Sequence, residues 1–402
     1  MFRIAFERGG ARVSQIHLFH SPLSRPSVAR IMKTQGSQGS MALFEEYPAL
    51  GDKLNWSPIG FYPTPVEEKP ELAERTGVGR LFIKRDDLSH PDYGGNKIRK
   101  LDFLLAEAAK RGARTIITFG GIGSNHFLAT AIHAASRGIK TAGVLVPQPV
   151  TPAVKRNMLC YLHYGAELNL AEGGYKEVPF ETLKVAARHS FNDGRPPFII
   201  PAGGSSVSGV LGYINAAFEL KKQIEAGDIP EPDYIFAAVG TCGTVSGLIA
   251  GCAAAGLKSR VVGVKVTDWV AANTFALSSL ANQATFKLFS IDQSFPVRVF
   301  TPFNVELLTE FFGGEYGRVT PESADAISMC ADCAGVKLEG VYTGKAFAGL
   351  VHTAKTRDLA DKTVLFWNTY NSVDMSGIAA QHDYSELPPE FHRFFESPES
   401  ES

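Results

Sequence analysis

From about Arg80 onward, two kinds of hydrophobic pattern alternate along the chain. Short apolar runs rich in Val, Ile and Phe, such as "RTIITFGG" and "DYIFAAVG", alternate with longer stretches whose apolar residues recur every three or four positions. Short runs of this kind predict strands, and the longer periodic stretches predict helices. The predicted strands cover residues 80–87, 114–121, 140–146, 167–171, 196–204, 233–240, 260–266 and 362–369.

The predicted helices lie between these strands. They cover residues 96–112, 124–137, 152–164, 207–224, 244–255 and 342–355, with further helix filling much of the chain up to 336. Strands that alternate with helices and are apolar throughout are typical of parallel sheets covered on both faces. Because there are more strands than one simple sheet holds, we predict an α/β fold with two open, twisted, mostly parallel sheets flanked by helices.

Composition narrows the class of protein. The chain has 402 residues, 45% of them hydrophobic, and a net charge of −1, which favours a soluble globular protein over a nucleic-acid or anionic-membrane binder. No uninterrupted apolar run reaches the roughly 18 residues of a transmembrane helix. The 5 cysteines are odd in number and sparse, so a reducing compartment such as the cytoplasm is expected, without a disulfide framework.

Residues 1–44 differ from the rest of the chain. They carry many basic residues and serines against a single acid, Glu7. This is the composition of a transit peptide, which would place the protein in mitochondria. The alternatives are an unstructured extension or an upstream start that precedes Met41. We predict a flexible extension at 1–44 and, from the sequence "ESPESES", a disordered tail at 391–402.

Three glycine-rich segments follow predicted strands and precede predicted helices. They read "FGGIGSNH", "PAGGSSVSG" and "AVGTCGTVSG". Such loops let backbone N–H groups approach an anion, and the positive end of the next helix assists. The third segment lacks the G-K-[ST] of a Walker loop and is no G-x-G-x-x-G fingerprint. It indicates a site for a small phosphate group, although tight strand-to-helix packing is the alternative for each loop.

Lys97 follows two glycines at the start of predicted helix 96–112, in "GGNKIRK". The positive end of the helix and the neighbouring cations destabilise an ammonium group, so a lowered pKa is expected. Such a lysine suits Schiff-base chemistry, with a surface lysine on an amphipathic helix as the alternative. An activated lysine together with a phosphate loop indicates pyridoxal 5′-phosphate, which carries both a phosphate and an aldehyde.

Five segments in order resemble the D-cysteine desulfhydrase and 1-aminocyclopropane-1-carboxylate (ACC) deaminase family, a branch of the fold type II pyridoxal-phosphate enzymes. They read "IKRDDL…GGNKIRKLDFLL", "GGIGSNHFLATA", "IPAGGSS…LGYINAAFEL", "VGTCGTVSGL" and "LEGVYTGKAFAGL". The resemblance covers roughly residues 55–380. It implies a fold like that of the tryptophan synthase β subunit and pyridoxal 5′-phosphate as cofactor.

The resemblance also implies roles for matching residues. Lys97 matches the lysine that holds the cofactor as a Schiff base and moves the Cα proton of the substrate. Ser124 matches a contact of the substrate carboxylate, and Asn125 matches a partner of the cofactor ring hydroxyl; helix capping is their alternative. Tyr316 and Tyr342 match two active-site tyrosines, with simple packing as the alternative. The matching phosphate loop is Gly240, Thr241, Cys242, Gly243 and Thr244.

Three departures from the family pattern concern the substrate. Gly123 stands where the family usually has glutamine, which leaves carboxylate recognition open. Thr343 stands where deaminases acting on the cyclopropane usually carry glutamate, and this favours the desulfhydrase branch. The usual "HTGG" is replaced by "WNTYNS", in which Thr369 is the candidate partner of the pyridine nitrogen. A neutral partner weakens the electron sink and favours loss of a good leaving group such as a thiolate.

Other polar residues are interpreted as structural. His126 and His133 are seven positions apart, which does not suit one metal site on a helix, so no metal is expected. Asp86 and Asp87 end a predicted strand, where a turn with local hydrogen bonds explains them as well as catalysis does. The one C-x-x-C sequence, at Cys330, is read as buried small residues rather than a zinc or redox site.

The resemblance therefore implies β-elimination of D-cysteine to pyruvate, ammonia and hydrogen sulfide. The alternatives are deamination of ACC or of another D- or L-amino acid, and non-catalytic binding of pyridoxal phosphate. A homodimer is implied by the resemblance alone, and no nucleic-acid or membrane partner is expected. The predicted large cofactor-binding domain comprises residues 45–96 and 207–390, and the predicted small α/β domain comprises 97–206.

Overall fold

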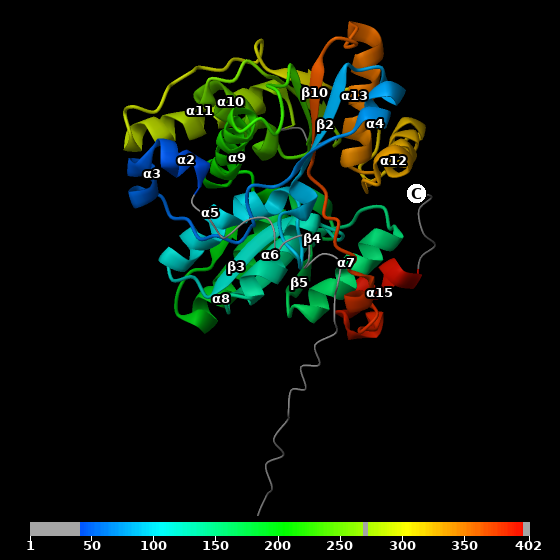
Figure 1. Cartoon of the computed structure of the whole chain (residues 1–402). Coiled ribbons are helices and arrows are strands. Elements are labelled where there is room, and N and C mark those ends of the chain that lie inside the picture. Colours follow the sequence, from blue (N-terminus) through cyan, green and yellow to red (C-terminus); the bar gives the residue numbers. More distant parts are fainter. Residues whose placement is uncertain (1–40, 268–271, 397–402) are drawn as a thin grey trace, which may run out of the picture. The chain divides into compact units, whose positions relative to one another are not determined.

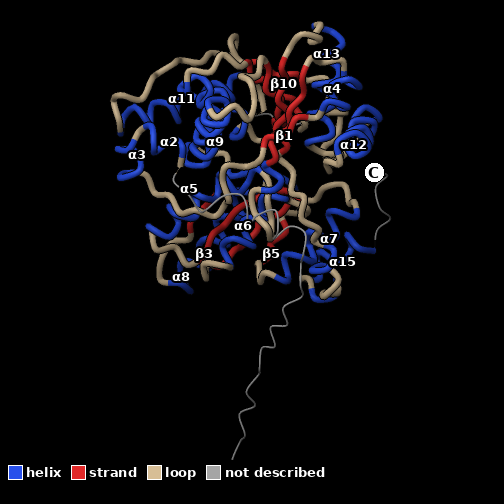
Figure 2. The backbone as a smooth tube through the Cα atoms, in the orientation of Figure 1, coloured by secondary structure: helices blue, strands red, loops and turns tan. Residues whose placement is uncertain are grey.

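The strands form two separate sheets in the computed structural model, which describes residues 41–267 and 272–396 (Figures 1 and 2). They are β1 (Val66–Glu68), β2 (Arg80–Arg85), β3 (Thr115–Gly121), β4 (Lys140–Val146), β5 (Glu167–Leu170), β6 (Phe198–Ile200), β7 (Tyr234–Val239), β8 (Arg260–Lys265), β9 (Glu306–Leu308) and β10 (Thr363–Asn368). The larger sheet has the order β1-β2-β10-β7-β8-β9, and the smaller has the order β5-β4-β3-β6. Only β1 is antiparallel to its neighbour among these strands, so the predicted two mostly parallel sheets are confirmed.

Helices occupy most of the chain between the strands. They are α2 (Ala42–Glu46), α3 (Pro48–Lys53), α4 (Pro70–Thr76), α5 (Asn96–Lys110), α6 (Asn125–Ala135), α7 (Pro152–His163), α8 (Val178–Asp193), α9 (Val207–Glu225), α10 (Gly243–Ala255), α11 (Thr274–Ile291), α12 (Pro321–Ala334), α13 (Thr343–Arg357), α14 (Ser376–Ala379) and α15 (Pro389–Glu396). None of them combines the length and apolar character needed to cross a membrane.

The larger sheet is buried on both faces, as its apolar strands predict. In β10, Val364 and Phe366 pack into a core cluster with residues of α4, α12 and α13. The alternate residues Leu365 and Trp367 pack into another cluster with residues of α9, α10 and α11. Figure 1 shows these two groups of helices on opposite sides of β2 and β10.

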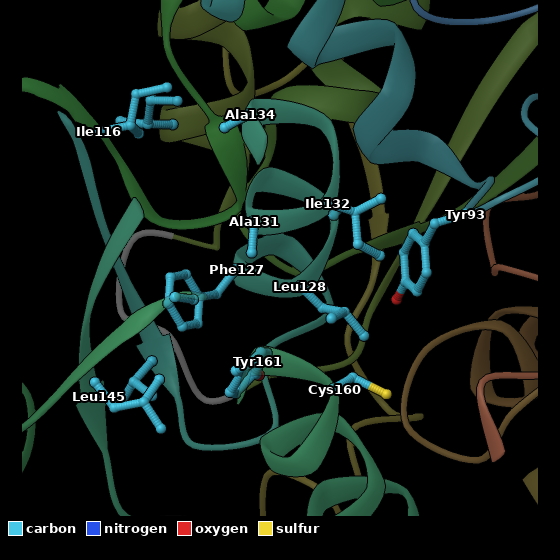
Figure 3. Close-up of a cluster of buried hydrophobic side chains, with 14 of the residues drawn as sticks. Tyr93, Ile116, Phe127, Leu128, Ala131, Ile132, Ala134, Leu145, Cys160 and Tyr161 are labelled. Carbon is cyan, nitrogen blue, oxygen red and sulfur yellow. The ribbon is translucent and has the colours of Figure 1, made fainter. Parts of the chain in front are cut away.

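The smaller sheet is covered in the same way. Leu145 of β4 joins a cluster built from α5, α6 and α7, whereas Val144 and Val146 join a second cluster with α8. Figure 3 shows the first cluster, in which the rings of Phe127 and Tyr161 lie 4.7 Å apart between centroids. Successive strand residues face opposite sides of a sheet, so this alternation follows directly from the apolar pattern.

The C-terminal segment corrects the prediction of disorder from residue 391. Residues Pro389–Glu396 form α15, and Phe391 and Phe394 are buried in the core cluster of the smaller sheet. The acidic and serine-rich composition extends only beyond these two phenylalanines, which are spaced to share one face of a helix. Residues 397–402 and the predicted extension up to residue 40 lie outside the described residues, while residues 42–44 belong to α2.

The domain boundaries remain a proposal, with one change at the C-terminal end. Met375, Ala379 and Leu387 share the core cluster of the smaller sheet, although residues up to 390 were assigned to the large domain. We therefore propose that the small domain also takes the chain from about Met375 onward. Helix α8 is not among the predicted helices. Residues 292–320, where further helix is predicted, are mainly irregular and contain the short strand β9.

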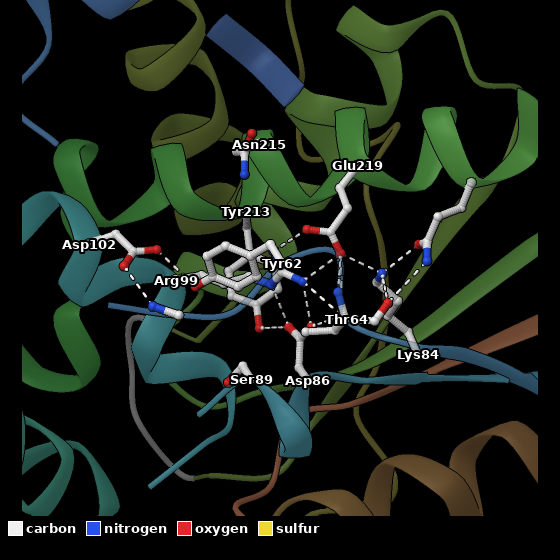
Figure 4. A network of polar contacts seen from close by, with 12 residues as sticks. Tyr62, Thr64, Lys84, Asp86, Ser89, Arg99, Asp102, Tyr213, Asn215 and Glu219 are labelled. Carbon is white, nitrogen blue, oxygen red and sulfur yellow. Dashed lines mark hydrogen bonds and ion pairs between the residues drawn. The ribbon is translucent and has the colours of Figure 1, made fainter. Parts of the chain in front are cut away.

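A buried ionic network anchors α5 to the larger sheet (Figure 4). Arg99 of α5 donates to Asp86 at 2.7 Å and to Glu219 of α9 at 2.8 Å, and all three side chains are at most 5% exposed. Lys84 of β2 contacts the same Glu219 at 2.5 Å. The carboxylate of Asp86 also accepts hydrogen bonds from Trp367 Nε1 and the Tyr213 hydroxyl, which supports its structural interpretation.

Candidate active site

The carboxyl ends of β3, β4, β7 and β10 border a cavity of about 310 Å³. Ligand sites in open parallel sheets lie at such edges. The cavity brings together every residue predicted for the site, namely Lys97, Ser124, Asn125, Gly240, Thr241, Cys242, Gly243, Thr244, Tyr316, Tyr342 and Thr369. They come from both sheets, so the cavity depends on how the two halves of the chain pack.

Lys97 occupies the first turn of α5, and the glycine before that turn lets it pack closely against the chain at Tyr370. A side chain at Gly95 would meet the Tyr370 carbonyl oxygen at 2.8 Å, and its φ of 90° is one that glycine adopts without strain. Lys97 Nζ donates to Asn96 Oδ1 at 2.8 Å, and Asn96 Nδ2 donates to Thr244 Oγ1 at 3.1 Å. Asn96 therefore links the lysine to the first turn of α10.

Burial lowers the pKa of Lys97 to about 8, and the carboxylate of Glu339 partly offsets this effect. The sequence predicted the lowered pKa but assigned it to the helix dipole and to neighbouring cations. Arg99 is instead engaged with Asp86 in the ionic network. The cause is loss of hydration inside the cavity wall, which disfavours the ammonium form.

A candidate anion cradle lies where two loops meet α5. The N–H of Gly243 donates to Ser205 Oγ at 3.2 Å, and the hydroxyl oxygens of Ser205 and Thr241 are 2.7 Å apart. Lys100 Nζ donates to the Gly203 carbonyl at 2.9 Å and lies 3.4 Å from Ser205 Oγ. A Cβ at Gly243 would meet Ser205 Oγ at 2.6 Å and Lys100 Nζ at 3.0 Å, so only glycine lets these two side chains lie against the start of α10.

Lys100 and Ser205 were not predicted as site residues. Burial, followed by the charge of Lys97, holds the pKa of Lys100 well below its usual range. An anion in the cradle would restore the charged form of such a lysine. The signals were present in "GGNKIRK" and "GGSS", but residues 100 and 205 become neighbours only in the folded chain.

Gly240 and Cys242 belong to the loop that leads into α10. Cys242 adopts φ 68°, a left-handed conformation that is uncommon outside glycine, immediately before the helix begins. Burial raises the pKa of its thiol to about 11, so the sulfur stays protonated near neutral pH. A Cβ at Gly240 would meet the Tyr342 ring at 3.0 Å, so this glycine lets the tyrosine lie against the loop.

Ser124 and Asn125 begin α6 at the cavity wall. Ser124 is the helix cap, because its Oγ accepts from the Phe127 N–H at 3.2 Å, and it also lines the cavity. The carbonyl oxygen of the Asn125 side chain accepts from the Tyr93 hydroxyl at 3.3 Å and from Asn157 Nδ2 at 3.0 Å. These contacts leave the amide nitrogen of Asn125 as its donor group toward a ligand.

The two predicted tyrosines form a pair. Their hydroxyl oxygens lie 2.6 Å apart, although Tyr316 and Tyr342 come from different segments. Burial, followed by the neighbouring Tyr316, holds the pKa of Tyr342 well above its usual range. The hydroxyl of Tyr342 is therefore protonated at neutral pH and can donate a proton or a hydrogen bond.

Glu339 is a cavity residue that the sequence interpretation missed, although it lies within "LEGVYTGK". Its carboxylate accepts from the backbone N–H groups of Val341, Tyr342 and Thr343, each at 2.8 Å. The hydroxyl of Thr343 accepts from the Glu339 N–H at 3.0 Å and is 3.4 Å from its carboxylate. This cap on α13 holds Tyr342 in place and engages the Thr343 side chain.

His126 and Thr369 complete the wall. His126 was interpreted as structural, yet it lines the cavity, is 3% exposed, and has no hydrogen-bond partner for either ring nitrogen among the described residues. Burial, then the charges of Lys97 and Lys100, hold its pKa well below the usual range, so the ring is neutral. The carbonyl of Thr369 accepts from the Asn96 N–H at 3.1 Å, and its side chain lines the cavity.

Comparisons with known proteins agree with this geometry. Residues 59–369 match the family model "Pyridoxal-phosphate dependent enzyme". A putative ACC deaminase of Pyrococcus abyssi is 35% identical over 311 residues, which cover 77% of this chain and 89% of the relative. A D-cysteine desulfhydrase of Klebsiella pneumoniae is 32% identical over 313 residues, covering 76% and 91%.

Solved structures extend the comparison to the fold. A crystal structure of an ACC deaminase homologue has a TM-score of 0.70 at 30% identity and covers 87% of this chain and 98% of its own. The structure of a fungal L-serine ammonia-lyase from Rhizomucor miehei has a TM-score of 0.53 at 21% identity, covering 81% and 98%. The second likeness supports the fold alone.

Proposed function

This chain belongs to the pyridoxal-phosphate-dependent enzyme family, and from that premise we propose that it is a lyase acting on D-cysteine. In the proposed reaction, D-cysteine and water give pyruvate, ammonia and hydrogen sulfide. When bound, pyridoxal phosphate supplies an electron sink for the negative charge that develops at the substrate Cα.

The residues of the cavity fit this cofactor. The backbone at Gly243, the hydroxyl of Ser205 and the buried amine of Lys100 suit its phosphate. Lys97 suits its aldehyde, because a pKa of about 8 makes the free amine accessible near neutral pH. Asn125 is proposed for the ring hydroxyl and Thr369 for the pyridine nitrogen.

Lys97 Nζ is the proposed base that removes the α-proton of the substrate. A base with a pKa near the working pH is both available in its neutral form and able to hold the proton. Its hydrogen bond to Asn96 fixes the position of Nζ near Thr244 in the first turn of α10. Ser124, at the start of α6, is the proposed contact of the substrate carboxylate.

Tyr342 is the proposed acid that assists departure of the sulfur. Its raised pKa keeps the hydroxyl protonated at neutral pH. The hydroxyl oxygen of Tyr316 lies 2.6 Å from that of Tyr342, so Tyr316 can pass a proton to Tyr342 after Tyr342 has donated its own. Protonation of the leaving thiolate completes the elimination. Hydrolysis of the remaining three-carbon amine then releases ammonia and pyruvate.

The observation that favours D-cysteine over ACC is the environment of Thr343. The position carries no carboxylate, and its hydroxyl is engaged by Glu339 at the start of α13. Together with the neutral Thr369, this favours a reaction that expels a good leaving group over one that must open a carbon ring. Deamination of ACC is the second candidate, because the P. abyssi relative is named a putative ACC deaminase.

A substrate panel tests the proposal. Purified holoprotein is incubated with D-cysteine, L-cysteine, D-serine and ACC, and pyruvate, 2-oxobutanoate (the four-carbon product of ACC deamination) and sulfide are measured. We expect pyruvate and sulfide in equal amounts from D-cysteine, and no product from the variant K97A. Formation of 2-oxobutanoate from ACC, with no product from the other three, would support the second candidate. Cofactor binding without turnover of any of the four would support a non-catalytic binder.

We also propose a homodimer in a reducing compartment. Support comes from α11, where Phe275, Phe286 and Phe289 are 70%, 49% and 38% exposed at spacings that place them near one helix face. Exposed apolar side chains on one face are typical of a surface that another protein covers.

The cytoplasm is the proposed compartment, with mitochondria as the alternative that depends on residues 1–44.

A further inference from the structure

Gln148 enters the cavity from the loop between β4 and α7, and none of the roles above involves it. Strands β3 and β4 are parallel neighbours, with Gly121 paired to Val146. The two residues after β4 therefore lead back over the end of β3. The side chain of Gln148 reaches the turn between β3 and α6, where its Oε1 accepts from the Gly123 N–H at 3.2 Å.

Two glycines make room for this arrangement. A Cβ at Gly121 would lie 1.9 Å from Gln148 Oε1, so only glycine lets the carboxamide lie over the turn. A Cβ at Gly123 would meet Val154 of α7 at 2.6 Å. A longer side chain at 123 has no space beside Val154, and the carboxamide at this turn comes from position 148 instead.

The bonding of Gln148 leaves its donors unused. With Oε1 engaged by Gly123, its two amide hydrogens remain to donate, and no residue in 41–267 or 272–396 accepts from them. Nearby, the backbone N–H groups of Asn125 and His126 in the first turn of α6 also have no acceptor within the same ranges. These donors and the positive end of α6 favour an anionic group at this wall.

We propose that Gln148 binds the α-carboxylate of the substrate together with the first turn of α6. This inference rests on the proposed function, which makes the substrate an amino acid. Lys97 must reach the α-carbon, and the cradle at Ser205 and Gly243 takes the other anion. The cavity thus separates a carboxylate subsite from a phosphate subsite, and Gln148 belongs to the first.

Binding of ligands that do not undergo elimination tests the assignment. D-alanine, L-alanine and ethylamine are titrated calorimetrically into the holoprotein and into Q148A, where ethylamine is alanine without its carboxylate. Hydrogen bonds to charged groups are strong, so Q148A should bind the accepted alanine enantiomer roughly 10- to 100-fold more weakly. Ethylamine should bind with an affinity within about 2-fold of that of the unchanged protein, since it lacks the carboxylate. Q148E should weaken alanine further through charge repulsion.

Q283A is the matched control, because Gln283 is an exposed glutamine on α11 away from the cavity. It should leave both affinities unchanged. Equal losses for alanine and ethylamine in Q148A would assign Gln148 to loop structure and overturn the inference, as would an unchanged alanine affinity. If Q148A does not fold, Q148E supplies the same comparison. If the unchanged protein binds none of the three amines, the proposed function fails as well. If the unchanged protein binds alanine but Q148A shows no selective loss, only the role of Gln148 fails.

Discussion

The hydroxyl oxygens of Tyr316 and Tyr342 lie 2.6 Å apart in the wall of the cavity that Lys97 also lines. Twenty-five residues separate the two tyrosines, and the Glu339 cap on α13 fixes one of them. A shared proton between two hydroxyls suits transfer to a leaving group, because either oxygen can donate.

Removal of the Tyr342 hydroxyl should therefore slow the reaction without loss of the cofactor. A general acid contributes roughly 10²- to 10⁴-fold to a rate, so Y342F should lower kcat for D-cysteine by about that range. Cofactor content is measured by absorbance and kcat by pyruvate release. Y384F, which changes a tyrosine outside the cavity, should behave like the unchanged protein. A kcat of Y342F within about 2-fold of the original would contradict the role.

Lys97 gives a pH dependence with a defined sign. Its folded pKa of about 8 lies below the roughly 10.4 of an unfolded lysine, so the native state releases the proton first. The rate at which apoprotein captures pyridoxal phosphate should rise with pH through about 8. The free energy of unfolding should gain from this group between about pH 8 and 10.4, where the unfolded chain binds more protons. Rates measured from pH 6 to 10 that stay constant would be inconsistent with a free-amine nucleophile.

Lys100 should control cofactor affinity rather than chemistry. K100M removes the buried amine that contacts Ser205, so the Kd for pyridoxal phosphate should rise roughly 10- to 100-fold, as expected for a charged hydrogen bond. Equilibrium dialysis against the cofactor gives this constant directly. K110M, at the exposed end of the same helix, is the control and should leave the Kd unchanged. An unaltered Kd in K100M would remove Lys100 from the cradle.

Arg99 should matter far more for stability than another arginine at the end of the same helix. R99A leaves the buried carboxylates of Asp86 and Glu219 short of their partner, and loss of one member of a buried pair costs roughly 3–5 kcal/mol. R111A breaks the exposed pair with Glu107, which contributes less than about 1 kcal/mol, and a contact with the Phe198 ring, which contributes roughly 0.5–1 kcal/mol. Urea denaturation measures both free energies. Similar values for the two variants would show that the network does not anchor α5.

Asp102 should give a second pH dependence of the free energy of unfolding, opposite in sign to that from Lys97. Burial raises the pKa of Asp102 to about 7. Hydrogen bonds from the Ile59 N–H and the Tyr62 hydroxyl lower this pKa but only partly offset the effect of burial. The native state then holds a proton that the unfolded chain has lost, so stability falls as pH rises from about 4 to 7. D102N should flatten this part of the stability curve, whereas D52N at an exposed site should not. A curve of unchanged slope in D102N would refute the assignment.

Local patterns in the sequence were sufficient for the fold class and for much of the site. The apolar runs predicted β3, β4 and β7 within one or two residues, because strands buried on both faces must be apolar throughout. Lys97 and the loop from Gly240 to Thr244 were identified from adjacent residues, and all of them line the cavity. Short motifs carry this information because the loop and helix start that present them are local structures.

Tertiary structure decided what those residues can do. The pKa of Lys97 is set by burial and by Glu339, which lies more than two hundred residues along the chain. Ser205 and Gln148 join the site through contacts between separate loops, which no local pattern contains. The sequence by itself determined most strands of the two sheets, many of the helices between them and which lysine is presented. Packing of the two sheets alone determined its charge and its neighbours, because hydration and electrostatic contact depend on distance in space rather than along the chain.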